Sequence, residues 1–117
     1  MKETIEKAWK NRELLKDKET KKAIEAVIEQ IDKGRLRVAE PEGDQWKVNE
    51  WVKKAVVLYF PIRQMETIAV GPFEFHDKMA LKTNYKELGV RVVPHAVARY
   101  GAYVASGVIM MPSYINI

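Results

Sequence analysis

The sequence contains no cysteine, and this absence excludes several classes of site at once. Disulfides, cysteine zinc ligands, iron–sulfur clusters and thiol nucleophiles all need a cysteine sulfur. The same absence suits a reducing compartment, so we expect a cytoplasmic protein. Histidine and serine are nearly as scarce, and neither Ser106 nor Ser113 lies in the Gly-x-Ser-x-Gly turn of a serine hydrolase.

Long hydrophobic runs are also missing. No apolar stretch approaches the roughly 20 residues that a membrane-spanning helix needs, and the lysine- and glutamate-rich beginning does not look like a secretory signal. We therefore expect no membrane partner. Glycine-rich phosphate loops and paired-histidine motifs are absent too, so the sequence predicts no metal site and no cofactor bound by this segment.

What the sequence does contain is enough for one compact domain with a hydrophobic core. Its 117 residues are 47% hydrophobic and 31% charged, which is typical of a folded globular chain. The net charge of +4 is modest, and the charges are unevenly distributed. Residues 92–117 contain a single charged side chain, Arg99, so the chain begins as a charged segment and ends as an apolar one.

The charged beginning of the chain predicts two amphipathic helices that pack as a hairpin. They are expected over residues 2–16 and 20–33, because apolar side chains recur there every three or four positions. In the second segment these are Ile24, Val27, Ile28 and Ile31. We expect Asp17 or Thr20 to cap the second helix at its start and Gly34 to follow its end.

Basic side chains on these helices suggest a nucleic-acid site as one alternative: Lys10, Arg12, Lys16, Lys18, Lys21 and Lys22. Carboxylates interrupt this group, and no aromatic residues are interleaved with it. We therefore interpret the group as a solvated helical face. A small nucleic-acid-binding domain would rest on charge alone, so we expect no nucleic-acid partner.

The middle of the chain predicts a strand pair followed by a third helix. Leu36 and Val38 indicate a strand that turns at residues 40–44 and pairs back through residues 45–48. Asn49 is expected to cap the helix. Pro61 is expected to stop that helix, because proline cannot continue its hydrogen-bonding pattern.

Two more strands and a short helix complete residues 1–90. The strands are expected over residues 65–70 and 73–81, separated by a Gly-Pro break. Residues 84–88 predict one helical turn that ends at Gly89. We therefore predict an α+β amino-terminal domain, residues 1–90, built of helices and short strands.

The apolar end of the chain has a six-residue repeat. A β-branched or aromatic residue recurs at Val97, Tyr103, Ile109 and Ile115. A small residue stands two positions before each of the last three, at Gly101, Gly107 and Ser113. This spacing is typical of a left-handed parallel β-helix, in which each short strand points a large side chain inward and each corner bends tightly. We predict that residues 91–117 form its first coil with those four side chains inward; an ordinary buried hairpin is the alternative.

More specific motifs lie in the same part of the chain. They are Arg91-Val-Val-Pro, Gly101-Ala-Tyr and Met111-Pro-Ser-Tyr-Ile-Asn-Ile. Upstream, Gly34-Arg-Leu-Arg-Val-Ala-Glu precedes Trp46 and the run Trp51-Val-Lys-Lys-Ala-Val-Val-Leu-Tyr-Phe. Over essentially its whole length the sequence resembles the amino-terminal part of the tetrahydrodipicolinate N-succinyltransferases, acyltransferases of the diaminopimelate and lysine pathway.

This resemblance implies a homotrimer with a helical amino-terminal domain, a left-handed β-helix of several coils and a short carboxyl-terminal domain. Family members transfer succinyl from succinyl-CoA to the amino group of a ring-opened dicarboxylate, without a metal. The family's substrate-binding arginine falls on Arg91, and a guanidinium can hold a carboxylate with two hydrogen bonds. From the residues alone, we would favour Arg91 as a bridge between the amino-terminal domain and the first coil.

The resemblance also implies that the family's proton-transfer residues and CoA groove lie beyond the stretch that this sequence matches. We therefore assign no catalytic residue, and interpret His95 as a packed or half-exposed side chain rather than a base. We expect the 117 residues alone to be inactive, with a non-enzymatic oligomerisation or regulatory module as the alternative function. We also expect the apolar edge of a lone coil to be rearranged, swapped between chains or covered by self-association.

Overall fold

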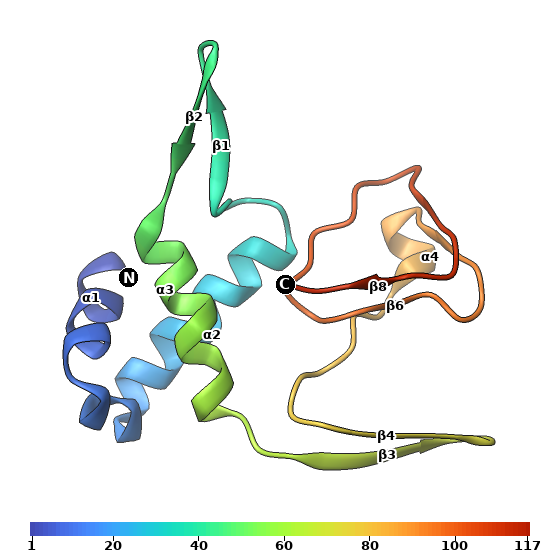
Figure 1. The fold of residues 1–117 in the computed structure, drawn as a ribbon, viewed down its shortest axis with the longest axis horizontal. Coiled ribbons are helices and arrows are strands. Elements are labelled where there is room, and N and C mark those ends of the chain that lie inside the picture. Colours follow the sequence, from blue (N-terminus) through green and yellow to red (C-terminus); the bar gives the residue numbers. More distant parts are fainter.

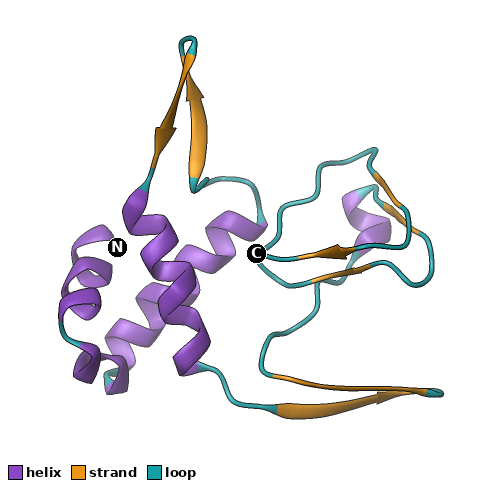
Figure 2. Ribbon diagram, in the orientation of Figure 1, coloured by secondary structure: helices purple, strands orange, loops and turns teal.

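The computed structural model describes all 117 residues as an α+β fold, as predicted (Figure 1, Figure 2). The helices are α1 (Lys2–Lys10), α2 (Lys18–Asp32), α3 (Glu50–Tyr59) and α4 (Tyr85–Leu88), with 3-10 turns η1 (Arg12–Lys16) and η2 (Phe60–Ile62). The strands pair as β1 (Ala39–Glu42) with β2 (Gln45–Val48), β3 (Glu66–Val70) with β4 (Phe73–Asp77), β5 (Arg91–Val92) with β7 (Ile109–Met110), and β6 (Val97–Ala98) with β8 (Tyr114–Ile115). None of the helices has both the length and the apolar character needed to cross a membrane.

The first three helices close around one shared core, which we call the helical unit. Its largest fully buried side chains come from all three helices: Ile5, Ile24, Val27, Ile28, Val52 and Leu58. Burying a side chain of this size stabilises the fold by about 1.5–3 kcal/mol. The predicted pair of helices is therefore joined by α3, which packs on both of them.

The first predicted helix is wrong in one respect, because it breaks at Asn11. α1 ends at Lys10, and the 3-10 turn η1 follows. Asn11 has extended backbone angles (φ −134°, ψ 98°), and its side-chain oxygen accepts a hydrogen bond from the Glu13 amide at 3.2 Å. Such local bonding competes with helix continuation. The break leaves Leu14 and Leu15 packed against the core.

α2 begins two residues earlier than predicted, with Asp17 at the N-cap position and Thr20 inside the helix, but the Asp17 side chain makes no capping hydrogen bond. Its other end follows the prediction, since Gly34 adopts a left-handed conformation with φ +72°. The Gly34 amide donates to the Ile31 carbonyl, and the Arg35 amide donates to the Gln30 carbonyl. This pair of bonds is the Schellman motif, in which glycine tolerates the positive φ that ends the helix.

The β1–β2 hairpin projects away from the helical unit (Figure 1). Its predicted turn at residues 40–44 is too long, because β1 runs through Glu42, which pairs with Gln45. The register leaves a two-residue loop, a length that antiparallel strands favour. Asn49 precedes α3 as predicted, but its side chain does not cap the helix and instead donates to the Arg37 carbonyl at 2.8 Å.

The β3–β4 hairpin is shorter than predicted. β4 stops at Asp77 instead of continuing to Leu81. Its antiparallel partner β3 begins at Glu66, opposite Asp77, and has no residue to pair with those that follow Asp77. Leu81 bridges to Arg99 in the following part of the chain. Residues 73–81, predicted as one strand, therefore pair with two different segments: β4 pairs with β3, and Leu81 pairs with Arg99.

Residues 89–117 wind into a coil in which each strand pairs in parallel with a strand one turn later. Arg91 pairs with Ile109, three hexads further along, and Val97 pairs with Tyr114, one residue short of that spacing. Glycines with positive φ, Gly101 and Gly107, lie at two of the bends. The six-residue repeat thus corresponds to the parallel pairing, and the alternative of an ordinary hairpin is excluded, because a hairpin is antiparallel.

The prediction of which side chains point into the coil is wrong by one position. Tyr103 and Ile109 are each 57% exposed. The buried side chains are instead Val90, Ala98, Val104 and Met110. Because side chains alternate across a strand, a shift of one residue exchanges inside and outside. Ile115 does pack against this small core, since β8 pairs one residue out of the hexad spacing.

One edge of the coil is covered and the other is open. The segment 80–82 runs along β6, where the Lys82 amide donates to the Ala98 carbonyl at 2.9 Å and the Tyr100 amide donates to the Ala80 carbonyl at 2.8 Å. β7 and β8 pair only with β5 and β6, so their outer edges carry no further strand. The coil therefore begins against the rest of the chain and presents free strand edges on its far side.

Candidate functional site

Arg91, the predicted substrate-binding residue, lies at the start of β5 with its side chain exposed. Its backbone is held in the coil, because its amide donates to the Val108 carbonyl at 3.0 Å. None of the six ion pairs in the structure includes Arg91, and its guanidinium makes no hydrogen bond to another residue. The guanidinium does not bridge to the helical unit, so its donors are free to receive a carboxylate.

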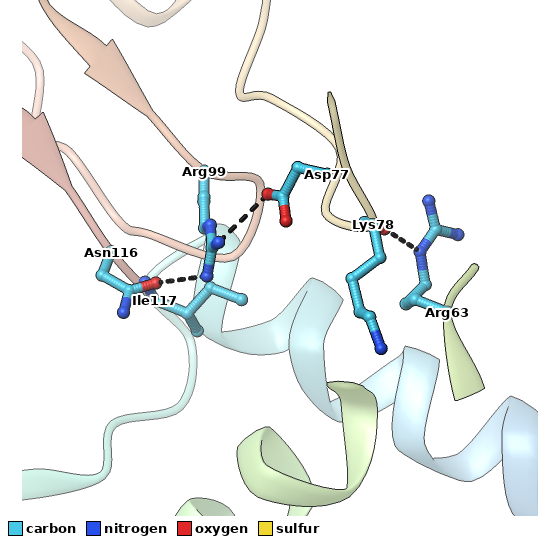
Figure 3. A network of polar contacts seen from close by, with 6 residues as sticks. All are labelled: Arg63, Asp77, Lys78, Arg99, Asn116 and Ile117. Atoms are coloured by element: carbon cyan, nitrogen blue, oxygen red, sulfur yellow. Dashed lines mark hydrogen bonds and ion pairs between the residues drawn. The ribbon is translucent and has the colours of Figure 1, made fainter. Parts of the chain in front are cut away.

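Arg99, the single charge of the apolar segment, is the centre of a polar junction (Figure 3). Its guanidinium donates to Asp77 Oδ2 at 3.0 Å and to Asn116 Oδ1 at 3.1 Å. The side chain is only 16% exposed, and its Cζ lies 5.5 Å from the centre of the Phe60 ring and 5.7 Å from that of Tyr114. A charge removed from water needs such partners, so Arg99 joins β4, η2 and β8.

The other side of this junction holds Asp77 in its ionised form. The backbone amide of Lys78 is the main cause that lowers the pKa of Asp77, and the positive charge of Arg99 lowers it further. Arg63 Nε donates to the Lys78 carbonyl at 3.1 Å, as Figure 3 shows. The end of β4 is therefore tied both to the coil and to the segment that leaves α3.

A second ion pair joins α2 to the coil. Lys82 Nζ lies 2.7 Å from Asp32 Oδ1, which also accepts a hydrogen bond from the Gly101 amide at 2.9 Å. The Lys82 side chain is 3% exposed and that of Asp32 16%. One carboxylate oxygen therefore fixes two segments against the end of α2. Removing either charge would leave the other buried without compensation.

Two clefts meet at Tyr103, where the coil lies beside the end of α2. One has a volume of about 450 Å³ and is lined mainly by apolar side chains, with Arg37 among them. Its neighbour, of about 410 Å³, is more polar and is lined by Lys33, Arg35 and Lys82 as well as by Asp32. Tyr103 lines both clefts, and its ring lies directly over Gly34.

These features can bind and position, but they do not form a catalytic set. No three histidine, aspartate or glutamate side chains gather in a way that could hold a metal ion. His76 shares a 2.9 Å hydrogen bond with Thr67 within its own hairpin. His95 is exposed, where the sequence predicts a packed or half-exposed side chain. Acyl transfer needs a base and an oxyanion donor beside a thioester site, and these side chains do not form such a set.

The residues of the two junctions, other than Arg99, were not found from the sequence. Asp32, Asp77 and Lys82 are ordinary charged residues in a chain that is 31% charged. Their partners lie far away in the sequence, so only the tertiary fold brings them together. The one available signal was the isolated charge of Arg99, because a lone charge in an apolar segment must find a partner.

Comparisons with known proteins agree with the motifs. Residues 1–62 match the family described as Tetrahydrodipicolinate N-succinyltransferase N-terminal. The 2,3,4,5-tetrahydropyridine-2,6-dicarboxylate N-succinyltransferase of Bordetella pertussis is 46% identical over 97% of this chain, and that of Paracidovorax citrulli is 45% identical over 97%. The enzyme of Variovorax paradoxus is 41% identical over 100% of the chain.

The chain spans about half the length of these curated relatives, 45% of the first two and 46% of the third. The match to the family covers more than half of the chain and includes all three helices of the helical unit. The chain therefore belongs to the tetrahydrodipicolinate N-succinyltransferase family.

Proposed function

We propose that the chain forms the amino-terminal part of a cytoplasmic enzyme that transfers succinyl from succinyl-CoA to tetrahydrodipicolinate, in diaminopimelate and lysine biosynthesis. The observation that carries this proposal is the identity of 46% to a relative named for this reaction, over 97% of the chain. The alignment includes the segment with Arg91 as well as the helical unit. The homotrimer of the family is part of the same proposal.

Arg91 is the residue that would bind the substrate. It is exposed on β5, and its guanidinium has no partner of its own. The substrate named for the relatives is a dicarboxylate, and a free guanidinium can hold a carboxylate with two parallel hydrogen bonds. In this role Arg91 orients the substrate and transfers no proton.

The coil would be the first turn of a left-handed parallel β-helix that begins after residue 90. Three features support this: parallel pairing about three hexads apart, buried side chains at Ala98, Val104 and Met110, and a closed edge opposite an open one. Each turn of such a solenoid rests on its neighbours. The outer edges of β7 and β8 are then the places where the next turn would pair.

The reaction needs more than these residues supply. Water first adds to the C=N bond of the cyclic substrate and opens its ring, which frees an amino group. That nitrogen attacks the thioester carbonyl, a C–N bond forms, the C–S bond breaks, and CoA leaves as the amine loses a proton. A base must accept that proton, and donors must stabilise the oxyanion. The 117 residues alone would therefore be inactive, and succinyl-CoA would bind only in the longer enzyme.

The test is a chimera that joins residues 1–117 to the part of the Bordetella pertussis relative beyond the aligned region. Release of CoA is followed with a thiol reagent, to which this chain contributes no cysteine background. We expect CoA release only when succinyl-CoA and tetrahydrodipicolinate are both present. A folded chimera without activity would contradict the proposed function, and turnover by the 117-residue chain would contradict its inactivity.

The role of Arg91 is tested in the same chimera with Arg91→Gln. A lost charged hydrogen bond is worth about 1.5–3 kcal/mol, so KM for the dicarboxylate should rise roughly 10- to 100-fold while KM for succinyl-CoA stays unchanged. Lys86→Gln is the matched control, because it removes an exposed positive charge on the neighbouring α4. Equal KM values for the two variants would remove Arg91 from the site.

The closed core of the helical unit supports a second candidate function, a non-enzymatic oligomerisation or regulatory module. Such a module would bind the intact enzyme without contributing to its site. A pull-down of a full-length relative by the 117-residue chain would support this candidate. Restored activity in the chimera would favour the enzyme instead.

A further inference from the structure

The β1–β2 hairpin is a two-stranded arm with an uncovered apolar face. It stands clear of the helical unit and the coil (Figure 1). Its register places Ala39 opposite Val48 and Pro41 opposite Trp46, on the same face. Trp46 is 66% exposed and Val48 53%. Since an isolated two-stranded hairpin is only marginally stable in water, this face needs a partner surface.

The arm is also divided by charge. Residues 40–44, which include the tip, contain three carboxylates and no basic side chain, although Lys47 of the other strand lies opposite Glu40. Residues 33–37 before its base contain three basic side chains and no carboxylate. At the tip Glu42 and Asp44 are exposed and belong to none of the ion pairs in the structure. At the base the same is true of Arg35 and Arg37. The tip and the base therefore carry charges of opposite sign, and neither set of charges forms an ion pair within the chain.

An apolar cleft lies at the base of the arm, among these arginines. Its lining includes Ile31, Leu36, Val38 and Tyr103, with Arg37 beside them, and its volume is about 450 Å³. A space of this size holds a small organic ligand, so it can receive one indole ring. Arg35 lines the adjoining cleft on the other side of Tyr103.

We propose that the arm of one copy of this chain docks into the cleft at the base of the arm of a second copy. Trp46 would enter the cleft, and Glu42 and Asp44 would pair with Arg35 and Arg37. A buried aromatic anchor surrounded by charged pairs is a common arrangement in protein interfaces. Within one copy, the length of the paired strands holds Glu42 and Asp44 at the tip away from Arg35 and Arg37 at the base, where Ala39 of β1 lines the cleft.

This contact joins two different surfaces, so it is a head-to-tail contact. Repeated from copy to copy, it produces a closed ring or a filament, and not a symmetric pair. The inference depends on the arm, the cleft and their charges. It does not depend on succinyl transfer, so its failure and the failure of the proposed function are separate results.

The test measures self-association of the 117-residue chain by sedimentation velocity over a range of concentrations. The base variant Arg35→Glu/Arg37→Glu and the tip variant Glu42→Lys/Asp44→Lys should each weaken association at least ~10-fold, since like charges then meet. Trp46→Ala should weaken it as well. Because all these side chains are exposed, the variants should keep the helical circular dichroism of the parent.

Reversing the charges of tip and base together should restore self-association, which only a contact between tip and base predicts. The chain that carries all four reversals should associate again, and so should an equal mixture of the base and tip variants, because each tip then meets a base of opposite charge. Lys21→Glu/Lys22→Glu is the control, with the same charge change on an exposed part of α2 and no expected loss. A monomeric parent chain, or an association that the reversals leave intact or do not restore, would overturn the proposal.

Discussion

The helical unit and the coil achieve stability in different ways. Eleven buried residues form the core shared by the helical unit and the segment around Met79, whereas the core of the coil has four. The backbone groups inside a helix are satisfied within that helix, but β7 and β8 of the coil each pair with a strand on one edge only. We therefore expect the same kind of substitution to affect the stability of the two regions differently.

Two polar junctions tie the coil to the rest of the chain, one to α2 of the helical unit and one to β4 of the neighbouring hairpin. Asp32 holds Lys82 and the Gly101 amide at the end of α2, and Asp77 holds Arg99 at the end of β4. Both are long-range contacts in which the basic side chain is largely buried, with Lys82 3% and Arg99 16% exposed. We therefore expect damage in the helical unit to spread to the coil, and damage in the coil to stay local.

The largest effect is expected from breaking the first junction. Asp32→Asn leaves Lys82 buried without a counter-charge, and the loss of one partner of a buried pair reduces stability by about 3–5 kcal/mol. Glu29→Gln is the control, because it removes the partner of Lys33 in a pair whose side chains are 45% and 47% exposed. That loss should be much smaller, because water screens an exposed pair. Urea unfolding measures both, and equal values would show that the buried pair does not hold the coil.

A cavity in the core of the helical unit should reduce stability more widely than a cavity in the core of the coil. Leu58→Ala removes a fully buried side chain from the helical unit and should reduce stability by about 2–5 kcal/mol, with loss of helical signal at lower urea. Met110→Ala makes the equivalent change in the coil and should leave the helical transition nearly in place. Circular dichroism at the helical band and amide exchange in the coil distinguish these outcomes. If both variants lowered the helical transition equally, the two regions would be one cooperative unit.

A smaller effect is expected where Tyr103 of the coil lies over Gly34. A Cβ at Gly34 would lie 2.5 Å from the Tyr103 ring, in a backbone with φ +72°. Gly34→Ala should therefore cost the strain of that conformation, about 1–2 kcal/mol, and displace the ring as well. Gly43→Ala is matched in φ, at +64°, but its Cβ would meet nothing within 4 Å, so it should show the strain alone. Thermal unfolding compares the two, and identical losses would mean that the ring yields without resistance.

The smallest effect is expected from acid. The pKa of Asp77 is lowered in the folded chain by the Lys78 amide and by Arg99, so its ionised form favours folding. This contribution is present above the unfolded value of about 3.9 and is lost as the pH falls through the folded pKa. It is modest because the carboxylate side chain is 38% exposed. The fall in melting temperature between neutral and acidic pH should be less steep in Asp77→Asn, and parallel curves would contradict the role of Asp77.

The helical unit was largely predictable, because helical periodicity and caps are local signals. The spacing of Ile24, Val27 and Ile28 identified the buried face of α2, and Gly34 identified its end. The break at Asn11 was missed because a single side-chain bond to Glu13 decides it. Such a bond competes with helix continuation by a small energy that the apolar pattern does not reveal.

For the coil, the sequence predicted the six-residue spacing of the strands, but it did not predict which side chains point inward. The six-residue repeat gave the spacing of the parallel pairs, yet Tyr103 and Ile109 point outward. Large side chains mark the repeat most clearly, whereas the inward positions of the coil include the small Ala98. The arginine at position 91 was located by the family motif, and its unpaired state became visible only in the structure.

Amide hydrogen exchange, followed residue by residue in the 117-residue chain and in the chimera with the Bordetella pertussis relative, tests the contrast between the two regions most directly. The amides of α2 should be strongly protected in both proteins. The amides of β7 and β8 should exchange quickly in the chain alone and become protected in the chimera, where a following turn covers their open edges. Equal protection of β7, β8 and α2 in the chain alone, unchanged in the chimera, would contradict a coil that depends on a further turn.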